Sequence, residues 1–203
     1  GRSSTAVATY TGSDGDDTFQ MKHGDDVIDA GAGTADKLVV TKNLILGGIN
    51  VDLSKTDDQV TTFNGNANTA ATKGFENVDL AGITGNFGAE VTAIKGGSTI
   101  IGTSNADVID GGAGADTITG GNGIDEITVG AGADTVSLTG IYAVANRDNI
   151  TGFVSGTDDI GLGAALTADL TSSGAAAVAK TATVTKVNNG AFNLDGLGNT
   201  DAY

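Results

Sequence analysis

Four consecutive nine-residue units, beginning at Gly102, decide the fold of this chain. They are GTSNADVID (102–110), GGAGADTIT (111–119), GGNGIDEIT (120–128) and VGAGADTVS (129–137). Position six of every unit is aspartate, and position eight is always isoleucine or valine. Two fixed columns over four successive units would not arise by chance, so the sequence indicates a repeat protein.

Each unit divides into a six-residue turn and a three-residue strand. Glycines at positions one, two and four permit positive φ and a backbone close enough to aim carbonyl oxygens inward. The aspartate adds a carboxylate at the end of the turn, whereas the aliphatic residue at position eight points into the core. Ca²⁺ prefers about six to eight hard oxygen ligands. The pattern therefore predicts turns that bind calcium.

Stacking of the units predicts an all-β fold, a flattened right-handed parallel β-roll or β-helix solenoid with short capping strands. Two turns make one coil, so turns on the same edge are two units apart. Asp107 is expected to face Asp125 across one ion, and Asp116 to face Asp134 on the opposite edge. Without an ion each pair of carboxylates repels, so calcium binding and folding should be one process.

A more degenerate block precedes these units. GSDGDDTFQ (12–20) and MKHGDDVID (21–29) keep the aspartate and the apolar column, and a third unit contains one extra residue. Lys22 lies in the turn of the second unit, where it would oppose a cation. The candidate ligands of this block are Asp17, Asp26, Asp36, Gly15 and Gly24.

Between the two blocks, the chain predicts short strands without a clear period. The tetrad Asn-Val-Asp-Leu occurs at 50–53 and at 77–80, three unit lengths apart, which favours a continuing solenoid. The expected strands are Lys37–Thr41, Ile49–Leu53, Val60–Phe63, Asn77–Ala81, Val91–Ile94 and Thr99–Ile101.

Composition narrows the classes of partner. The net charge is −15, which excludes nucleic acid, since phosphate binding needs a basic surface, and favours multivalent cations. The 203 residues include no Cys, Pro or Trp, so disulfides and thiolate metal sites are excluded. No apolar run has the length of a membrane span, and no signal peptide is visible.

These residues resemble the RTX (repeats-in-toxin) nonapeptide family, strongly over 102–137 and moderately over 12–29. The resemblance implies a β-roll that folds on Ca²⁺ and is exported by type I secretion. Position-six aspartates would give carboxylate oxygens and turn residues backbone oxygens. In the later block the implied ligands are Asp107, Asp116, Asp125, Asp134, Gly111, Gly112, Gly114, Gly120, Gly121, Gly123, Gly130, Gly132 and Asn105.

The expected organisation has four parts. Degenerate repeats occupy 1–40, a strand-rich solenoid segment 41–101, and the RTX β-roll with its capping segment 102–162, where Phe153, Ile160 and Leu162 would close the core. The Ala/Thr-rich stretch 163–203 is expected to form β-structure or a segment associated with secretion.

Three functional classes remain open, and catalysis has little support. With one histidine and no cysteine, the usual nucleophile–base pairs are nearly excluded, so the chain is not expected to be an enzyme. The favoured class is a structural module of a secreted bacterial surface-layer protein, which self-associates at the cell surface with a surface polysaccharide as a further candidate partner. The others are the export domain of an RTX toxin, protease or lipase, and an RTX adhesin or ice-binding module.

Overall fold

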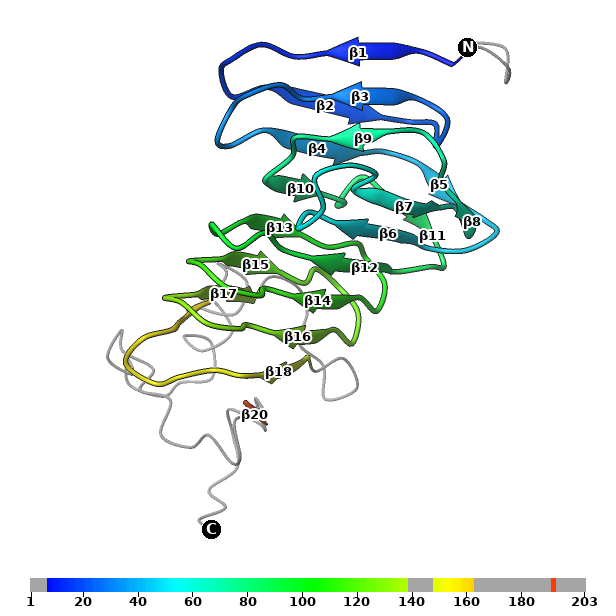
Figure 1. Cartoon of the computed structure of the whole chain (residues 1–203). Coiled ribbons are helices and arrows are strands. Elements are labelled where there is room, and N and C mark those ends of the chain that lie inside the picture. Colours follow the sequence, from blue (N-terminus) through cyan, green and yellow to red (C-terminus); the bar gives the residue numbers. More distant parts are fainter. Residues whose placement is uncertain (1–6, 139–147, 163–190, 193–203) are drawn as a thin grey trace.

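The computed structural model describes residues 7–138, 148–162 and 191–192, and these residues form a solenoid of stacked strands (Figure 1). The described residues contain strands and no helix. Accordingly, no helix in them is long and apolar enough to cross a membrane. The all-β solenoid expected from the repeats is confirmed.

Two large sheets face each other along the solenoid. The first has the order β2-β4-β10-β13-β15-β17-β19, and every neighbouring pair in it is parallel. Its strands are β2 (Thr18–Met21), β4 (Lys37–Val40), β10 (Asn77–Asp79), β13 (Thr99–Ile101), β15 (Thr117–Thr119), β17 (Thr135–Leu138) and β19 (Asp159–Leu162).

The second large sheet is parallel in its middle and antiparallel at both ends. Its order is β8-β7-β6-β12-β14-β16-β18-β20. Its strands are β6 (Ile49–Asp52), β7 (Val60–Phe63), β8 (Asn66–Ala67), β12 (Ala89–Thr92), β14 (Val108–Asp110), β16 (Glu126–Thr128), β18 (Asn149–Thr151) and β20 (Ala191–Phe192).

Two small sheets complete the described part. One consists of β1 (Thr9–Thr11), β3 (Val27–Asp29) and β9 (Thr72–Lys73), and the other of β5 (Asn43–Leu44) and β11 (Thr84–Gly85). All their pairings are parallel.

The nine-residue period produces the alternation between the two large sheets. Successive units contribute β14, β15, β16 and β17, which belong to the two sheets in turn. Residues two units apart therefore pair, as Ile109 does with Ile127 and Ile118 with Val136. This spacing of 18 residues is the one expected from the sequence.

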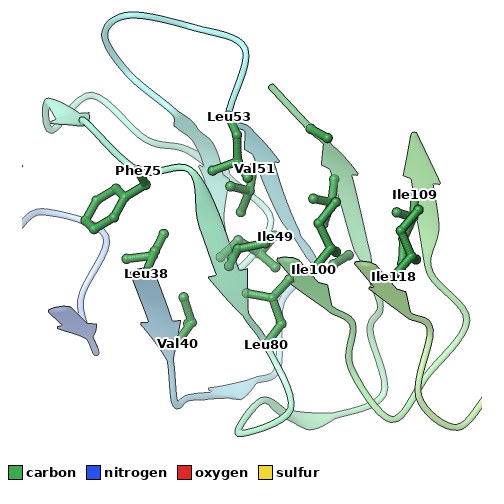
Figure 2. Packing of buried hydrophobic residues seen from close by; sticks show 14 of the residues in the cluster. Leu38, Val40, Ile49, Val51, Leu53, Phe75, Leu80, Ile100, Ile109 and Ile118 are labelled. Atoms are coloured by element: carbon green, nitrogen blue, oxygen red, sulfur yellow. The ribbon is translucent and has the colours of Figure 1, made fainter. Parts of the chain in front are cut away.

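The core is a thin layer of aliphatic side chains between the sheets (Figure 2). The side chains at position eight of the four units are at most 1% exposed, so this column is the core column as predicted. Phe19 and Phe75 add an edge-to-face aromatic contact near the N-terminal end, with ring centroids 6.0 Å apart. Phe153 is buried in the same core and Ile160 packs against it, as expected for capping residues.

The segment between the repeat blocks departs from a simple solenoid. The two Asn-Val-Asp-Leu tetrads lie in β6 and β10, which belong to different sheets. The chain between them forms the antiparallel pairs β6–β7 and β7–β8, so three regular units do not fill this interval. The continuing solenoid expected from the 27-residue spacing is confirmed, because both tetrads belong to stacked strands of the two large sheets.

The expected strand at Val91–Ile94 begins earlier in the structure, at Ala89. Val91 pairs with Val51 and Ile109, so it occupies the core column. Strands in this fold begin one or two residues before that column, and β12 follows the rule. The expectations for 163–203 lie outside the described residues, apart from β20.

Candidate metal centres at the solenoid edges

The position-six aspartates stand at the last residue of each turn, directly before a strand. Because the strands alternate between the sheets, Asp107 and Asp125 lie on one edge of the solenoid, and Asp116 and Asp134 lie on the other. All four side chains are buried, with at most 1% exposed. The sequence predicted this pairing of the aspartates.

Each of these carboxylates is fixed by the coil that precedes it. Oδ1 of Asp125 accepts the backbone N–H of Asp107 at 3.0 Å, and Oδ1 of Asp134 accepts that of Asp116 at 2.9 Å. The first member of each column is held in the same way, by the N–H of Ala89 for Asp107 and of Ser98 for Asp116, both at 2.6 Å. We call this arrangement the carboxylate ladder.

The second oxygen of most of these carboxylates has no hydrogen-bond donor. In the matched units this applies to Oδ2 of Asp116, Asp125 and Asp134, and each of these atoms is buried. A buried carboxylate oxygen without a donor is costly, because it has lost water and gained nothing in exchange. Such an atom is where a bound cation would supply the missing favourable interaction.

Burial also acts on the protonation of these groups. It raises the pKa of Asp125 to about 7 and that of Asp116 to about 6, with further increases from neighbouring carboxylates. Burial likewise raises the pKa of Asp107 and Asp134 above the ordinary aspartate value. The upward direction of all four pKa shifts shows that negative charge at these edges is unfavourable unless a positive charge accompanies it.

Glycine is required around the carboxylates for reasons of space and of backbone conformation. A Cβ on Gly120 would lie against Oδ2 of Asp125, and one on Gly111 would lie 3.2 Å from Oδ2 of Asp116. Gly121 has φ of 113°, a conformation that side chains rarely adopt, and it lies against the carbonyl oxygen of Thr103 in the preceding coil. Carboxylate oxygens and carbonyl oxygens of the preceding coil therefore both lie close to the glycines of these turns.

The described residues contain no group of three or more His, Cys, Asp or Glu side chains that could hold a metal. A cation at these edges would therefore draw most of its ligands from backbone carbonyls, with one or two carboxylates. This donor set consists only of oxygen, which suits Ca²⁺ and disfavours zinc or copper. The residues present fit calcium.

Comparison with known families agrees with this chemistry. The model of the RTX calcium-binding nonapeptide repeat matches residues 101–136, in four copies. The chain carries RTX repeats. None of the curated proteins compared with the chain matches it. The RTX repeats and the fold together make this a calcium-binding β-roll module.

The first RTX repeat differs from the other three. Thr103 stands where they have glycine, and its N–H and hydroxyl donate to the Asp107 carboxylate at 2.7 and 2.8 Å. Both oxygens of Asp107 are thereby satisfied within the protein. Asn105 donates its amide to the carbonyl oxygens of Gly85 and Phe87, both at 3.2 Å, and so links this turn to the preceding coil.

The N-terminal candidates fall into different environments. Asp17 accepts the N–H and hydroxyl of Ser13, at 2.7 and 2.9 Å, so its turn resembles that of Asp107. Asp26 is buried and accepts the N–H of Ala8 at 3.3 Å. Asp36 is fully buried, and its Oδ2 has no donor, as in the last three RTX repeats.

The two N-terminal glycines proposed as ligands have other surroundings. A Cβ on Gly24 would lie 2.9 Å from the Phe63 side chain, so packing against β7 explains this glycine. Gly15 is exposed, and the Ser13 hydroxyl is the nearest atom to its Cβ position, at 3.8 Å. Lys22 is exposed.

The ladder contains three further acids that lie outside the predicted repeat units. Oδ1 of Asp148 accepts the N–H of Asp125, and Oδ1 of Asp158 accepts the N–H of Asp134. Glu76 accepts the N–H of Asp36 at 2.8 Å. Each of the three stands two residues before a core-column residue, as the RTX aspartates do, so a search for an acid followed two positions later by an aliphatic residue would have found them.

Proposed function

We propose that this chain is a calcium-dependent structural module of a secreted bacterial surface-layer protein, and that it is not an enzyme. The observation that carries the proposal is the set of three buried aspartate oxygens without donors in the RTX repeats, at Asp116, Asp125 and Asp134. Such groups oppose folding of the metal-free chain and favour it when a cation is present.

The ladder explains how the protein's own residues would respond to calcium. The backbone N–H groups of the preceding coil hold Oδ1 of each aspartate in place, so stacking of the coils also fixes the position of Oδ2. Bound Ca²⁺ supplies two positive charges to carboxylates that otherwise repel each other. The glycines keep the carbonyl oxygens of adjacent coils close to the same volume. Ordering of the coils and binding are thus favoured together.

The same chemistry supports an extracellular location. Extracellular calcium modules bind with Kd of about 10⁻⁴ to 10⁻³ M, a range in which the ion is plentiful outside cells and scarce inside them. The absence of cysteine and the net charge of −15 are compatible with this environment. RTX repeats typically occur in secreted proteins, so we propose type I secretion and a cell-surface destination.

Edge strands at the N-terminal end support self-association. β1 and β2 are the first strands of their sheets, and all three residues of β1 are exposed. An exposed edge strand presents unpaired N–H and C=O groups to another chain. A second copy could continue the sheets there, which would extend the solenoid into a surface lattice.

Circular dichroism during calcium titration tests the folding part of this proposal. We expect β-structure to increase with Ca²⁺ and to decrease after EDTA, with Mg²⁺ at the same concentration as the control. A spectrum that is identical with EDTA and with millimolar Ca²⁺ would contradict it.

Assembly is tested separately. Purified chain should form ordered sheets under electron microscopy at millimolar Ca²⁺ and remain dispersed with EDTA. A chain that folds on calcium but stays monomeric at high concentration would favour the export-domain alternative and would contradict the proposed surface lattice.

The ice-binding alternative finds no regular face in the described part of the chain. Thr119 and Thr128, at position nine of their units, lie in β15 and β16 of different sheets, so they do not form one column. The longest run of paired threonines in the described strands joins Thr99, Thr117 and Thr135. It extends over only three strands, since Asp159 follows Thr135 in the next one.

A further inference from the structure

The turns of this solenoid are of two kinds, which differ in what the second carboxylate oxygen contacts. In capped turns, the residue four positions before the aspartate donates its backbone N–H to Oδ2, at 2.7 Å in every case. The donors and acceptors are Ser13 with Asp17, Thr103 with Asp107, and Val154 with Asp158.

In open turns, Oδ2 is buried and has no donor, and a glycine with positive φ stands near the start of the turn. The carboxylates are Asp36, Asp116, Asp125 and Asp134. Gly112, Gly121 and Gly130 stand four positions before their aspartates, with φ of 72°, 113° and 93°, and Gly31 stands five positions before Asp36, with φ of 109°. The residues that cap their turns are not glycine and have no positive φ.

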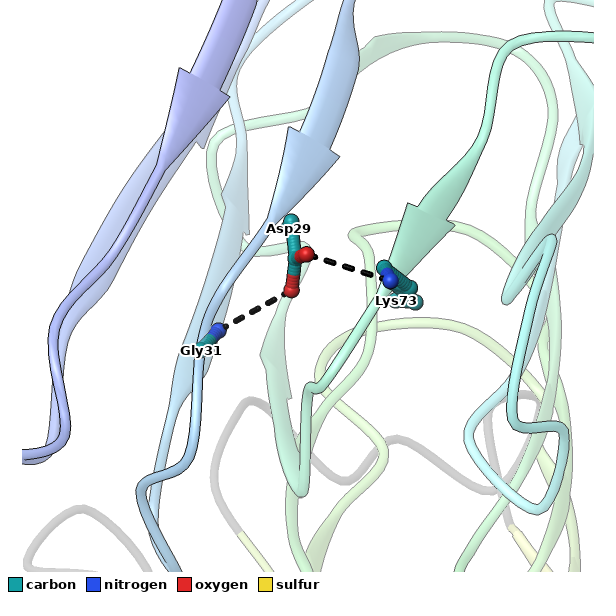
Figure 3. Close-up of polar contacts among 3 residues, drawn as sticks. All are labelled: Asp29, Gly31 and Lys73. Atoms are coloured by element: carbon teal, nitrogen blue, oxygen red, sulfur yellow. Dashed lines mark hydrogen bonds and ion pairs between the residues drawn. The ribbon is translucent and has the colours of Figure 1, made fainter.

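The glycine conformation has a direct effect on the hydrogen bond. In two open turns the glycine N–H is directed backwards, to the side chain two residues earlier. Gly31 donates to Oδ1 of Asp29 at 3.3 Å, as Figure 3 shows, and Gly112 donates to Oδ1 of Asp110 at 3.0 Å. Gly112 stands four positions before Asp116, so its N–H is turned away from that carboxylate. The turn of Asp36 is one residue longer, and the N–H of Ala32, four positions before Asp36, donates to the carbonyl oxygen of Ser13 at 3.1 Å instead.

One open turn, at residues 30–36, lies far outside the RTX repeats. Asp36 is 0% exposed, and its Oδ1 is held by the N–H of Asp17 at 2.6 Å. Its other oxygen, Oδ2, would lie 2.8 Å from a Cβ on Gly33, so it faces the interior of the turn. The carbonyl oxygen of Ser13, which accepts the N–H of Ala32 at 3.1 Å, would lie against a Cβ on Gly31.

A second carboxylate borders this turn from the following coil. Oε2 of Glu76 accepts the N–H of Asp36 at 2.8 Å, although 40 residues separate the two in sequence. Glu76 directly precedes β10, which is the neighbour of β4 in the sheet. The nearby Lys73 does not neutralise this pair, because its ammonium forms an ion pair with Asp29 at 3.1 Å (Figure 3).

We infer that the turn at residues 30–36 binds a divalent hard cation such as Ca²⁺, with the carboxylates of Asp36 and Glu76 as its acidic ligands. The buried Asp36 oxygen without a donor requires a positive partner, and glutamate in place of aspartate offers a longer reach into the turn. The site is assembled only when the chain has passed through β7–β9 and returned to the sheet at β10. The inference rests on the proposed calcium response of the RTX repeats.

Amide hydrogen exchange followed by mass spectrometry tests the site locally, in EDTA and in about 5 mM Ca²⁺, a concentration above the Kd range typical of extracellular calcium modules. In the wild type, we expect calcium to slow exchange in peptides that cover residues 30–40 and 71–80, in addition to those that cover the RTX repeats. Asp36→Asn should abolish the change in the first two peptides and retain it in the repeats. Asp17→Asn, in a capped turn of the same edge, is the matched control and should retain both.

Glu76→Gln keeps an oxygen for the Asp36 N–H and removes one charge from a partly exposed side chain. We expect it to weaken calcium binding at this turn by about tenfold, and it decides the question if Asp36→Asn does not fold. Unchanged calcium protection at residues 30–40 in folded Asp36→Asn, or an unchanged calcium concentration for half-maximal protection there in Glu76→Gln, overturns the inference. If calcium does not slow amide exchange in the RTX repeats of the wild type, the proposed function is refuted instead.

Discussion

Replacement of Asp125 by asparagine should change stability in opposite directions with and without calcium. The amide keeps an oxygen for the N–H of Asp107, at 3.0 Å in the wild type, and places a neutral group where Oδ2 has no donor. In the metal-free chain at about pH 8, above the raised pKa, the substitution removes a buried charge and should stabilise the fold. In calcium it removes a ligand and should destabilise the fold.

The magnitude follows from the protonation of the wild-type group. Burial raises the pKa of Asp125 to about 7. The difference from the ordinary aspartate value corresponds to about 4 kcal/mol, and screening by water near the turn reduces it to about 2 kcal/mol. For a chain of this size, that free energy raises the thermal midpoint by about 4 to 8 °C.

Asp107→Asn is the matched control, because Asp107 belongs to a capped turn. Its oxygens accept the N–H of Ala89 and both donors of Thr103, so an amide NH₂ would face a donor. This variant should destabilise the metal-free chain by about 1 to 3 kcal/mol.

Thermal unfolding followed by circular dichroism, in EDTA and in saturating Ca²⁺, measures all three proteins. A lower midpoint for Asp125→Asn than for the wild type in EDTA would refute the reasoning. Shifts of the same sign for both variants in EDTA would refute it equally.

Three further predictions concern pH, capping and the core. The raised pKa values of Asp116 (about 6) and Asp125 (about 7) mean that the folded chain binds protons more tightly than the unfolded chain. The contribution of these two groups to metal-free stability is therefore full below about pH 4 and is lost as the pH rises through 6 to 7. Unfolding midpoints in metal-depleted buffer should show this fall in stability, and the fall should be smaller in the variant with both aspartates replaced by asparagine. Thr103→Gly should open the capped turn, lower the stability of the fold more in EDTA than in Ca²⁺, and increase the calcium stoichiometry measured by equilibrium dialysis. Thr103→Ser should change neither the stability nor the stoichiometry. Ile118→Ala should lower the free energy of unfolding by about 2 to 5 kcal/mol in both conditions, because the side chain is fully buried in the core column; an effect confined to the metal-free state would contradict this explanation.

The sequence predicted most where its period was regular. The nine-residue spacing was enough to pair Asp107 with Asp125 and to assign Ile118 to the core, because a fixed period determines which residues stack. Glu76 could not be found in this way, since the antiparallel strands β7 and β8 separate it from Asp36 and interrupt the nine-residue period. The chemical pattern survives there nevertheless, with Val78 two positions after the acid.

Other features depended on local geometry that the period does not contain. Asn64-Gly65 is a strong signal for a two-residue hairpin turn, and both residues have positive φ in the turn between β7 and β8, so this hairpin was predictable but was missed. The capping of Asp107 was not predictable from the periodic pattern, because it depends on the direction of the Thr103 N–H.

The carboxylate ladder also affects how sharply the module can respond to its environment. Oδ1 of Asp125 contacts the coil before it, and Oδ1 of Asp148 in the coil after it accepts the N–H of Asp125, so every coil inside the stack shares its contacts with two neighbours. The turns on the two edges alternate along the chain and are offset by half a coil. Ordering of a turn on one edge therefore also positions the next turn, which lies on the other edge. A linear array with such nearest-neighbour coupling behaves cooperatively. The module should therefore change between loose and rigid over a narrow interval of calcium concentration, and longer arrays of the same repeats should narrow that interval further.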